Sequence, residues 1–280
     1  MRGPLEALYR DFDYRGRLAH DVIRFPRRYA DPLDREIVAL LAASLAYGRV
    51  DLFGPWVERL LAWLGPSPRA FALAFVPARD AALFAPFHYR FTRGPDLAAA
   101  MLAIHRLLVR HGSLRMAFLA GYSDVDLDVR PALDRFAASL LDQDFSAVGM
   151  RRPSRGLKHL FPRPVDGSAC KRWHLFLRWM VRRDHLDFGD WPEIPPAKLL
   201  IPLDTHVANM ADALGLTRRR SRTGRMVEEV TASLRALDPA DPIKYDFALC
   251  HTRMRGDCRG RRDPGVCPGC GLRPICRHWR

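Results

Sequence analysis

Several features are missing from this sequence, and each absence narrows its class. It has no apolar run long enough to cross a bilayer and no N-terminal segment typical of a secretion signal. The alternation of apolar and polar residues that marks strands is scarce, and no internal repeat or low-complexity segment occurs. We therefore expect a cytoplasmic protein, not bound to a membrane, that is neither mainly β nor built from repeats.

Lysine is rare in a chain that is otherwise strongly basic. The formal net charge is +14, and of the 45 basic residues 41 are arginine. Such an excess of positive charge favours a polyanionic partner, because each neutralised phosphate releases condensed counterions. Arginine keeps its proton in proteins whereas lysine can lose it, so a well-placed lysine is a candidate for amine chemistry. The lysines are Lys158, Lys171, Lys198 and Lys244.

Apolar residues recur at helical spacing along most of the chain, which predicts an all-α protein. With 280 residues, 48% of them hydrophobic, the chain can form one large domain or two closely packed ones. Two irregular segments interrupt the pattern, at 151–164 and 184–202. The first carries the basic residues Arg151, Arg152 and Lys158, which are candidates for binding DNA. The expected helices lie near 37–45, 56–64, 95–110, 114–121, 129–143, 171–183, 205–214, 223–237 and 242–252.

Four of the six cysteines form a compact C-terminal pattern, Cys258-x8-Cys267-x2-Cys270-x5-Cys276. Without a secretion signal, a disulfide framework is not expected, so the pattern indicates a metal site. The long, short and medium spacing favours an iron–sulfur cluster, because a zinc ribbon usually pairs two Cys-x2-Cys knuckles; a structural zinc remains the alternative. Cys250 falls on an apolar helix face and is expected in the core, whereas Cys170 has no assigned role.

This C-terminal pattern resembles the Cys-x6-Cys-x2-Cys-x5-Cys loop of endonuclease III and the adenine-mismatch glycosylases, which belong to the helix-hairpin-helix DNA glycosylase superfamily. Here the first gap is two residues longer. The resemblance implies that Cys258, Cys267, Cys270 and Cys276 bind a 4Fe–4S cluster. It also implies that Arg259, Arg261 and Arg262 in the loop contact the DNA backbone, which positions a protein without specifying sequence. A merely solvated basic loop is the alternative.

Asp204 precedes a predicted helix in the segment Leu203-Asp204-Thr205-His206. An aspartate there is an ordinary N-cap, and that is the structural interpretation. The superfamily, however, has a catalytic aspartate in a Val-Asp-Thr-His setting about fifty residues before its cluster, and Asp204 lies 54 residues before Cys258. The resemblance therefore implies that Asp204 is catalytic, since a carboxylate there can stabilise positive charge at the sugar and move protons.

Lys171 lies in the next candidate motif, Gly167-Ser168-Ala169-Cys170-Lys171-Arg172. In bifunctional members of the superfamily a lysine at the start of the helix after a glycine-rich hairpin forms a Schiff base. The resemblance implies this role for Lys171, with Gly167, Ser168 and Arg172 binding DNA phosphate. A surface lysine on a helix is the alternative. The usual Leu-Pro-Gly-Val-Gly hairpin is absent here. The 33-residue gap to Asp204, wider than the usual gap of just under twenty, resembles the archaeal 8-oxoguanine glycosylases.

Residues 31–41 resemble the first barrel helix of the superfamily, after which a glutamine often fills the space left by an extruded base. Ser44 stands near that position and is too short, so Tyr47 or Arg49 is the candidate substitute. Aromatic residues that could stack on an extruded base, or simply form core, are Trp173, Trp179, Phe87, His88 and Tyr89.

Together these patterns predict a helix-hairpin-helix glycosylase fold. We expect a helical barrel domain over 30–199 and a second domain, formed by 1–29 and 200–280, that carries the cluster. The expected function is a monomeric, nucleoid-associated DNA glycosylase and AP lyase in base-excision repair. Its partner would be duplex DNA with a damaged base, an oxidised purine such as 8-oxoguanine first, although RNA stays open as a substrate. The alternatives are a non-catalytic nucleic-acid-binding protein on the same scaffold and a zinc-stabilised interaction protein.

Overall fold

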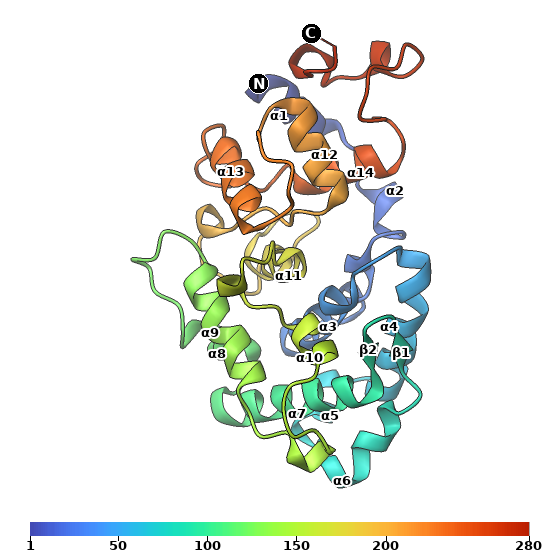
Figure 1. Cartoon of the computed structure of the whole chain (residues 1–280), viewed down its shortest axis with the longest axis vertical. Helices are drawn as coiled ribbons and strands as arrows, with labels where there is room; N and C mark the ends of the chain where they lie inside the picture. The colour runs from blue at the N-terminus through green and yellow to red at the C-terminus, as the bar shows by residue number, and fades with distance from the viewer. Residues whose placement is uncertain (280) are drawn as a thin grey trace. The chain divides into compact units, whose positions relative to one another are not determined.

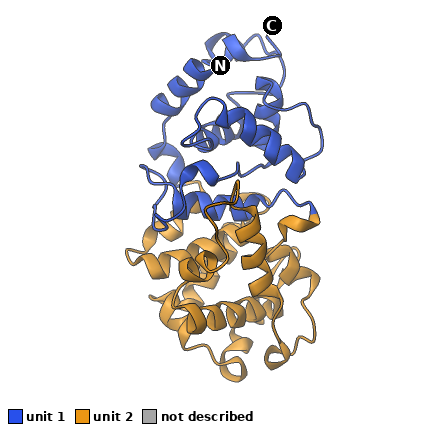
Figure 2. Cartoon of the chain, turned by 90° about the vertical axis from the view of Figure 1, so that its left-hand side faces the viewer, with its two compact units in different colours: residues 1–19, 167–280 blue, residues 20–166 orange. Residues whose placement is uncertain are grey.

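A computed structural model describes residues 1–279 and shows a mostly helical protein, as the sequence predicts. The chain divides into two compact units (Figure 2). The terminal unit contains Met1–Ala19 and the chain from Gly167 onward, and the central unit contains His20–Asp166. Within the described range, no helix combines the length and the apolar character that a bilayer crossing requires.

The boundaries of these units differ from the predicted domains 30–199 and 1–29 with 200–280. The segment 167–199, expected in the barrel, belongs to the terminal unit. Its helix α11 (Lys171–Val181) is tied there by a buried ion pair between Arg178 and Asp246 of α14 (Asp246–Met254). Pairing between residues so far apart in the chain leaves no periodic signal in the sequence.

The central unit is built around α3 and α7, both largely buried. Asp31 caps the N-terminal end of α3, because its side chain accepts a hydrogen bond from the backbone N–H of Leu33 at 2.8 Å. Gly65, with φ +72°, ends α4. The helices of this unit are α3 (Pro32–Leu45), α4 (Val50–Leu64), α5 (Pro68–Leu73), α6 (Pro77–Asp80), α7 (Gly94–His111), α8 (Leu114–Leu119), α9 (Arg130–Leu141) and α10 (Arg155–Leu160).

Several elements of the central unit were not expected, including α5, α6, a short hairpin and α10. A hairpin of two short antiparallel strands, β1 (His88–Tyr89) and β2 (Thr92–Arg93), precedes α7. The segment 151–164, predicted as a loop, contains α10, which Ser154 caps by accepting a hydrogen bond from Leu157 N–H at 2.9 Å. Figure 1 shows α10 and the hairpin in the same unit as α3.

The terminal unit joins the two ends of the described chain. Its helices are α1 (Arg2–Asp11), α2 (Arg15–Leu18), α11, α12 (Thr205–Leu214), α13 (Gly224–Arg235) and α14. Aromatic rings fasten the N-terminal segment to α14: Tyr14 and Phe12 both pack against Phe247, with ring centroids 5.6 and 6.0 Å apart. Figure 1 accordingly shows α1, α12 and α14 together.

Short 3-10 helices connect the longer elements in both units. They are η1 (Val22–Arg24), η2 (Pro26–Arg28), η3 (Ala81–Phe84), η4 (Ser146–Val148), η5 (Pro164–Asp166), η6 (Pro196–Lys198), η7 (Cys267–Gly269) and η8 (Arg273–Ile275).

Most of the aromatic residues considered for base stacking lie in the core. Trp173, Trp179, Phe87 and Tyr89 are buried, and of the five only His88 is exposed.

Candidate functional site

Lys171 is the first residue of α11 and is half-buried. The turn before it contains two residues in the left-handed region, Gly167 with φ +75° and Cys170 with φ +45°. Such a φ is uncommon for a residue with a side chain, and Cys170 is only 3% exposed. The Ser168 hydroxyl accepts a hydrogen bond from the Cys170 N–H at 3.2 Å, which fixes the turn that aims the start of α11.

The first turn of α13 packs directly on this turn. The backbone N–H of Gly224 donates to the carbonyl oxygen of Gly167 at 3.1 Å. A Cβ added at Gly224 would lie 3.3 Å from the carbonyl oxygen of Ser168, so a larger residue would push the two segments apart. The glycine thus allows α13 to support the backbone that precedes Lys171.

Asp204 caps α12, so the structural interpretation of this residue is correct. Its Oδ1 accepts hydrogen bonds from the backbone N–H groups of His206 and Val207, at 2.8 and 2.9 Å. The other carboxylate oxygen, Oδ2, lies 3.6 Å from the Sγ of Cys250, a weak donor. Capping therefore uses Oδ1 of this half-buried carboxylate, and Oδ2 does not take part in the cap.

Cys250 was expected in the core, and this expectation is wrong. The residue is half-buried on α14, with its sulfur between the Asp204 carboxylate and the Met254 sulfur, 3.7 Å away. Asp246 lies one turn earlier on the same helix. The spacing of Asp246, Cys250 and Met254 by four residues was the available signal that these side chains share a helix face.

Asp246 is a buried residue on which the charges of both candidate residues act, and it was not among the predicted site residues. Its side chain is buried, Arg178 donates to its Oδ2, and its Oδ1 has no hydrogen-bond partner among residues 1–279. Burial raises the pKa of Asp246 to about 6; the Asp204 charge raises it further, while the charges of Arg178 and Lys171 oppose the rise. Lys171 and Asp204 therefore both lie within electrostatic reach of one buried carboxyl.

Asp246 is one member of a buried ionic network. Arg178 Nε lies 3.2 Å from Asp187 Oδ1, and Arg182 Nη2 lies 3.0 Å from Asp184 Oδ2. The same Arg182 nitrogen lies 2.9 Å from Asp241 Oδ2. Two guanidinium groups thus face four carboxyl groups. Burial raises the pKa of Asp187 as well, as expected where negative charge exceeds positive charge in a dry site.

The four C-terminal cysteines line one cavity of about 30 Å³ together with side chains of α12 and the end of the described chain. Backbone N–H groups point at two of the sulfurs, from Gly260 to Cys258 at 3.4 Å and from Asp263 to Cys267 at 3.3 Å. Burial raises the pKa of the Cys270 thiol, and the other three cysteines add to the effect. Over residues 1–279 no group of three or more His, Cys, Asp or Glu side chains has ligating geometry.

The donor set nevertheless has the chemistry that a metal group requires. Four thiols converge on a single cavity, and thiolate is the ligand of both iron–sulfur clusters and structural zinc. Amide N–H groups directed at sulfur stabilise the thiolate form.

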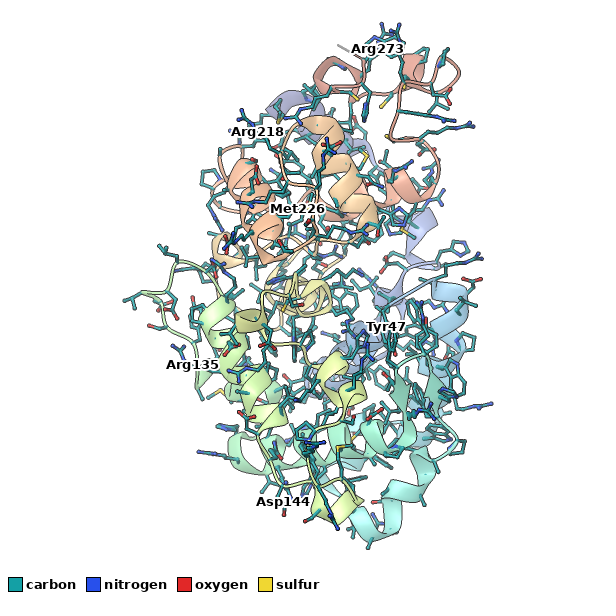
Figure 3. All side chains as sticks on the ribbon, viewed as in Figure 1. Tyr47, Arg135, Asp144, Arg218, Met226 and Arg273 are labelled. Carbon is teal, nitrogen blue, oxygen red and sulfur yellow. The ribbon has the colours of Figure 1, made fainter. Side chains whose placement is uncertain are left out.

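The arginines around the cysteines have different surroundings. Arg259 Nε lies 3.3 Å from Asp263 Oδ2, and Arg261 is exposed. Arg262 and Arg273 both place a guanidinium carbon over the ring of Trp279, 4.7 and 4.3 Å from its centroid (Figure 3 labels Arg273). The indole thus orders two cations of the tail side by side.

The remaining DNA-binding candidates are divided between the units. Gly167 is exposed and Ser168 and Arg172 are half-buried, all in the terminal unit. Those of the central unit, Arg151, Arg152 and Lys158, are all exposed.

Three residues were considered for the space left by an extruded base. Ser44, which is too short for that task, is buried in α3, and Arg49 pairs with Asp51 at 2.8 Å. Tyr47 uses its hydroxyl inside the central unit, donating to the Tyr89 carbonyl at 2.9 Å. Arg49 and the hydroxyl of Tyr47 thus both have partners within the central unit.

The raised pKa of Asp246 makes a prediction for stability. The native protein holds a proton that the unfolded chain, with an ordinary pKa of 3.8, releases first, so the free energy of unfolding falls as pH rises from about 4 to about 6. Asp246→Asn lacks this titration. The wild-type protein should therefore lose about 2 kcal/mol relative to the variant across that window, measured by urea denaturation at each pH.

The exposed carboxylate of Asp212 on α12 supplies the matched control. The difference between wild type and Asp212→Asn should stay nearly constant with pH. A constant difference for Asp246→Asn as well would show that the buried carboxyl does not titrate as stated.

Comparison with known proteins adds one finding. A protein-family profile described as "Protein of unknown function (DUF2400)" matches residues 21–255, which is most of the chain and includes Lys171, Asp204 and Asp246. No curated protein and no solved structure matched the chain. The chain therefore belongs to the DUF2400 family.

Proposed function

We propose that the protein is a DNA-base glycosylase with AP lyase activity that acts through an imine formed on Lys171. The observation that carries the proposal is the joint position of Lys171 and Asp204. Each lies at the N-terminal end of a helix in the terminal unit, and both act on the buried carboxyl of Asp246. An amine and a carboxylate so arranged are the groups that covalent base excision needs.

The proposed reaction begins with attack of the neutral Lys171 amine on C1′ of the nucleotide. The new C–N bond forms as the glycosidic bond breaks, and the base leaves with the electron pair of that bond and takes up a proton. Asp204 accepts the proton that the attacking nitrogen loses. Asp204 returns this proton to O4′ as the C1′–O4′ bond breaks, which opens the sugar ring to a protonated imine. Water then removes a C2′ proton, and the C3′–O bond breaks so that the 3′ phosphate leaves with its electron pair.

The environment of Asp204 suits this role. Two backbone N–H groups hold Oδ1 in place, and Oδ2 lies 3.6 Å from the Cys250 sulfur, a weak donor. A carboxylate fixed in this way can also stabilise positive charge that develops at the sugar, without reorganising during the reaction.

Binding to DNA follows from the charge of the chain. The net charge of +14 supports a polyanionic partner. In the proposal Arg259, Arg261 and Arg262 contact the phosphate backbone, and so do Gly167, Ser168 and Arg172 at the start of α11. Arg151, Arg152 and Lys158 contribute from the central unit. A nucleoid location and a damaged base, an oxidised purine first, rest on the resemblance to the archaeal 8-oxoguanine glycosylases.

The cofactor in this proposal is a 4Fe–4S cluster bound by Cys258, Cys267, Cys270 and Cys276. When bound, it would cross-link the tail and hold the arginine loop in one conformation, and the excision chemistry would not involve it. The convergence of the four thiols on one cavity supports this assignment.

Lys171→Ala tests the central step. With duplex DNA that carries a single 8-oxoguanine, borohydride should trap the wild-type protein on the DNA and fail to trap the variant, because no other amine would form the imine. Lys198→Ala, another lysine of the terminal unit, should trap normally. Undiminished trapping in Lys171→Ala would exclude this residue as the nucleophile, and a panel of other lesions would identify the base released.

Asp204 needs a pair of variants, because it both caps α12 and serves the reaction. Asp204→Asn keeps a good N-cap but removes the charge, so base release should fall by about 100-fold with stability nearly unchanged. Asp204→Ala should lose a similar amount of activity and also about 1 kcal/mol of stability. Single-turnover base release and thermal melting measure the two effects. Full activity in Asp204→Asn would reduce the residue to a helix cap.

Metal analysis tests the cofactor. Protein purified without oxygen should be brown and contain about four irons and four sulfides per chain. Cys276→Ser should lose most of this iron, while Cys170→Ser, which changes a buried cysteine outside the cavity, should retain it. A colourless protein with one zinc per chain would replace the cluster by a structural zinc.

A further inference from the structure

Phe91 is an exposed aromatic residue that the proposed reaction does not use. It lies in the two-residue turn between β1 and β2 and is 49% exposed. Arg90, the other turn residue, has φ +50°, so the backbone turns sharply just before the ring. In contrast to the buried Phe87 and Tyr89 on the same hairpin, Phe91 presents its ring at the surface of the central unit.

Three neighbouring side chains extend this ring into a larger surface, which we call the Phe91 platform: Phe91, Tyr47, His159 and Arg155. The rings of Tyr47 and Phe91 are nearly parallel, with centroids 6.4 Å apart and an interplanar angle of 25°. His159 of α10 lies 5.0 Å from Phe91 and 4.6 Å from Tyr47. The guanidinium carbon of Arg155 lies 5.8 Å from the Phe91 centroid, in cation–π range.

Hydrogen bonds from the segment after α3 hold the hairpin under the platform. The Tyr47 hydroxyl bonds both strands, at the carbonyl oxygen of Tyr89 and the hydroxyl of Thr92, at 2.9 and 2.8 Å. The Tyr89 hydroxyl donates in turn to the Tyr47 carbonyl oxygen. Figure 3 labels Tyr47, whose position can be followed there. The reciprocal bonds fix the hairpin to the helical body.

Helix α10 holds the hairpin from its other side. Asp96 accepts from Arg93 N–H at 2.7 Å and from the Ser154 hydroxyl that caps α10. Gly156 permits this approach, because an added Cβ would lie 2.7 Å from the Phe91 carbonyl oxygen and 2.1 Å from Asp96 Oδ2. The platform is thus set in place before any ligand arrives, which lowers the entropic cost of binding.

The charge around the platform is positive. The hairpin segment 88–93 and the segment 151–159 contain no Asp or Glu, and both carry exposed cations. The nearby carboxylate of Asp51 acts electrostatically on Tyr89 of the hairpin. Its charge is offset by an ion pair with Arg49, 2.8 Å away. A phosphodiester strand is the complement of such a surface. The exposed cations are Arg90, Arg93, Arg151, Arg152, Arg155 and Lys158.

We propose that the Phe91 platform stacks on an unpaired base of a DNA strand whose phosphates bind the surrounding cations. An exposed ring with a guanidinium beside it suits a nucleobase, because every base offers a π face for stacking and the backbone supplies the negative charge. Buried base pairs of an intact duplex offer no such face. The inference rests on the proposed function only for its choice of DNA as partner, and it requires neither the Lys171 chemistry nor the cluster.

Binding of the full-length protein to labelled oligonucleotides tests the platform. Fluorescence anisotropy would compare a duplex with one central unpaired thymine and the same duplex fully paired. Phe91→Ala should weaken binding to the unpaired-base duplex by about 10-fold and leave the paired duplex within about two-fold. Phe91→Tyr should bind as the wild type does. Val109→Ala, which removes an exposed apolar side chain of α7, should change neither affinity.

Photochemistry gives a direct readout of stacking. With 5-iodouracil at the unpaired position, irradiation of the wild-type complex should cross-link the base to Phe91, as mapped by mass spectrometry. Equal affinities of Phe91→Ala and wild type for the unpaired-base duplex, or a cross-link confined to residues outside the platform, would overturn the proposal.

The outcomes also separate this proposal from the glycosylase proposal. If Phe91→Ala binds the unpaired-base duplex normally while base release from lesion DNA depends on Lys171, only the platform fails. If Lys171→Ala traps normally while binding of the unpaired base depends on Phe91, only the assignment of Lys171 as the nucleophile fails and the platform stands.

Discussion

The terminal unit depends on two buried guanidinium groups, those of Arg178 and Arg182. They bind the carboxyl groups of the 184–187 segment and of 241–246, and so join α11 to the start of α14. Desolvation offsets much of the attraction in such a network, whereas removing one partner costs about 3–5 kcal/mol. The network therefore contributes less to net stability than to geometry. It fixes how the helix that begins with Lys171 lies against the helix that carries Cys250.

The same network sets the electrostatics near the candidate site. With more carboxyl groups than guanidiniums in a buried region, full ionisation is unfavourable, and burial raises the pKa of Asp246 to about 6. This carboxyl is influenced by Asp204 and by Lys171, so its charge acts on both in return. An apolar core would hold α11 and α14 equally well. It would not place an ionisable group within the electrostatic influence of both Asp204 and Lys171.

What the sequence could predict follows from the range of the interactions involved. Asp31 and Asp204 were identifiable as helix starts, because capping joins residues two or three apart. The β1–β2 hairpin was missed because strands of two residues show no alternation, and α10 because six residues give too little periodicity. The buried ionic network could not be predicted because its members lie far apart in the chain: Arg178 and Asp246 are separated by 68 residues. Long-range ion pairs leave no local pattern.

The cysteine tail poses a separate physical problem, because few of its own side chains are buried. The family match ends at residue 255, before the first of the four cysteines. Between Cys258 and Trp279 the buried apolar side chains are Leu272 and Ile275, and the Arg277 N–H reaches the carbonyl oxygen of Ala213 on α12 at 2.7 Å. Two buried side chains offset only a small part of the entropy lost on ordering about twenty residues. Segments of this size usually need a cross-link, and this is the part that the proposed metal group would play at the four thiols.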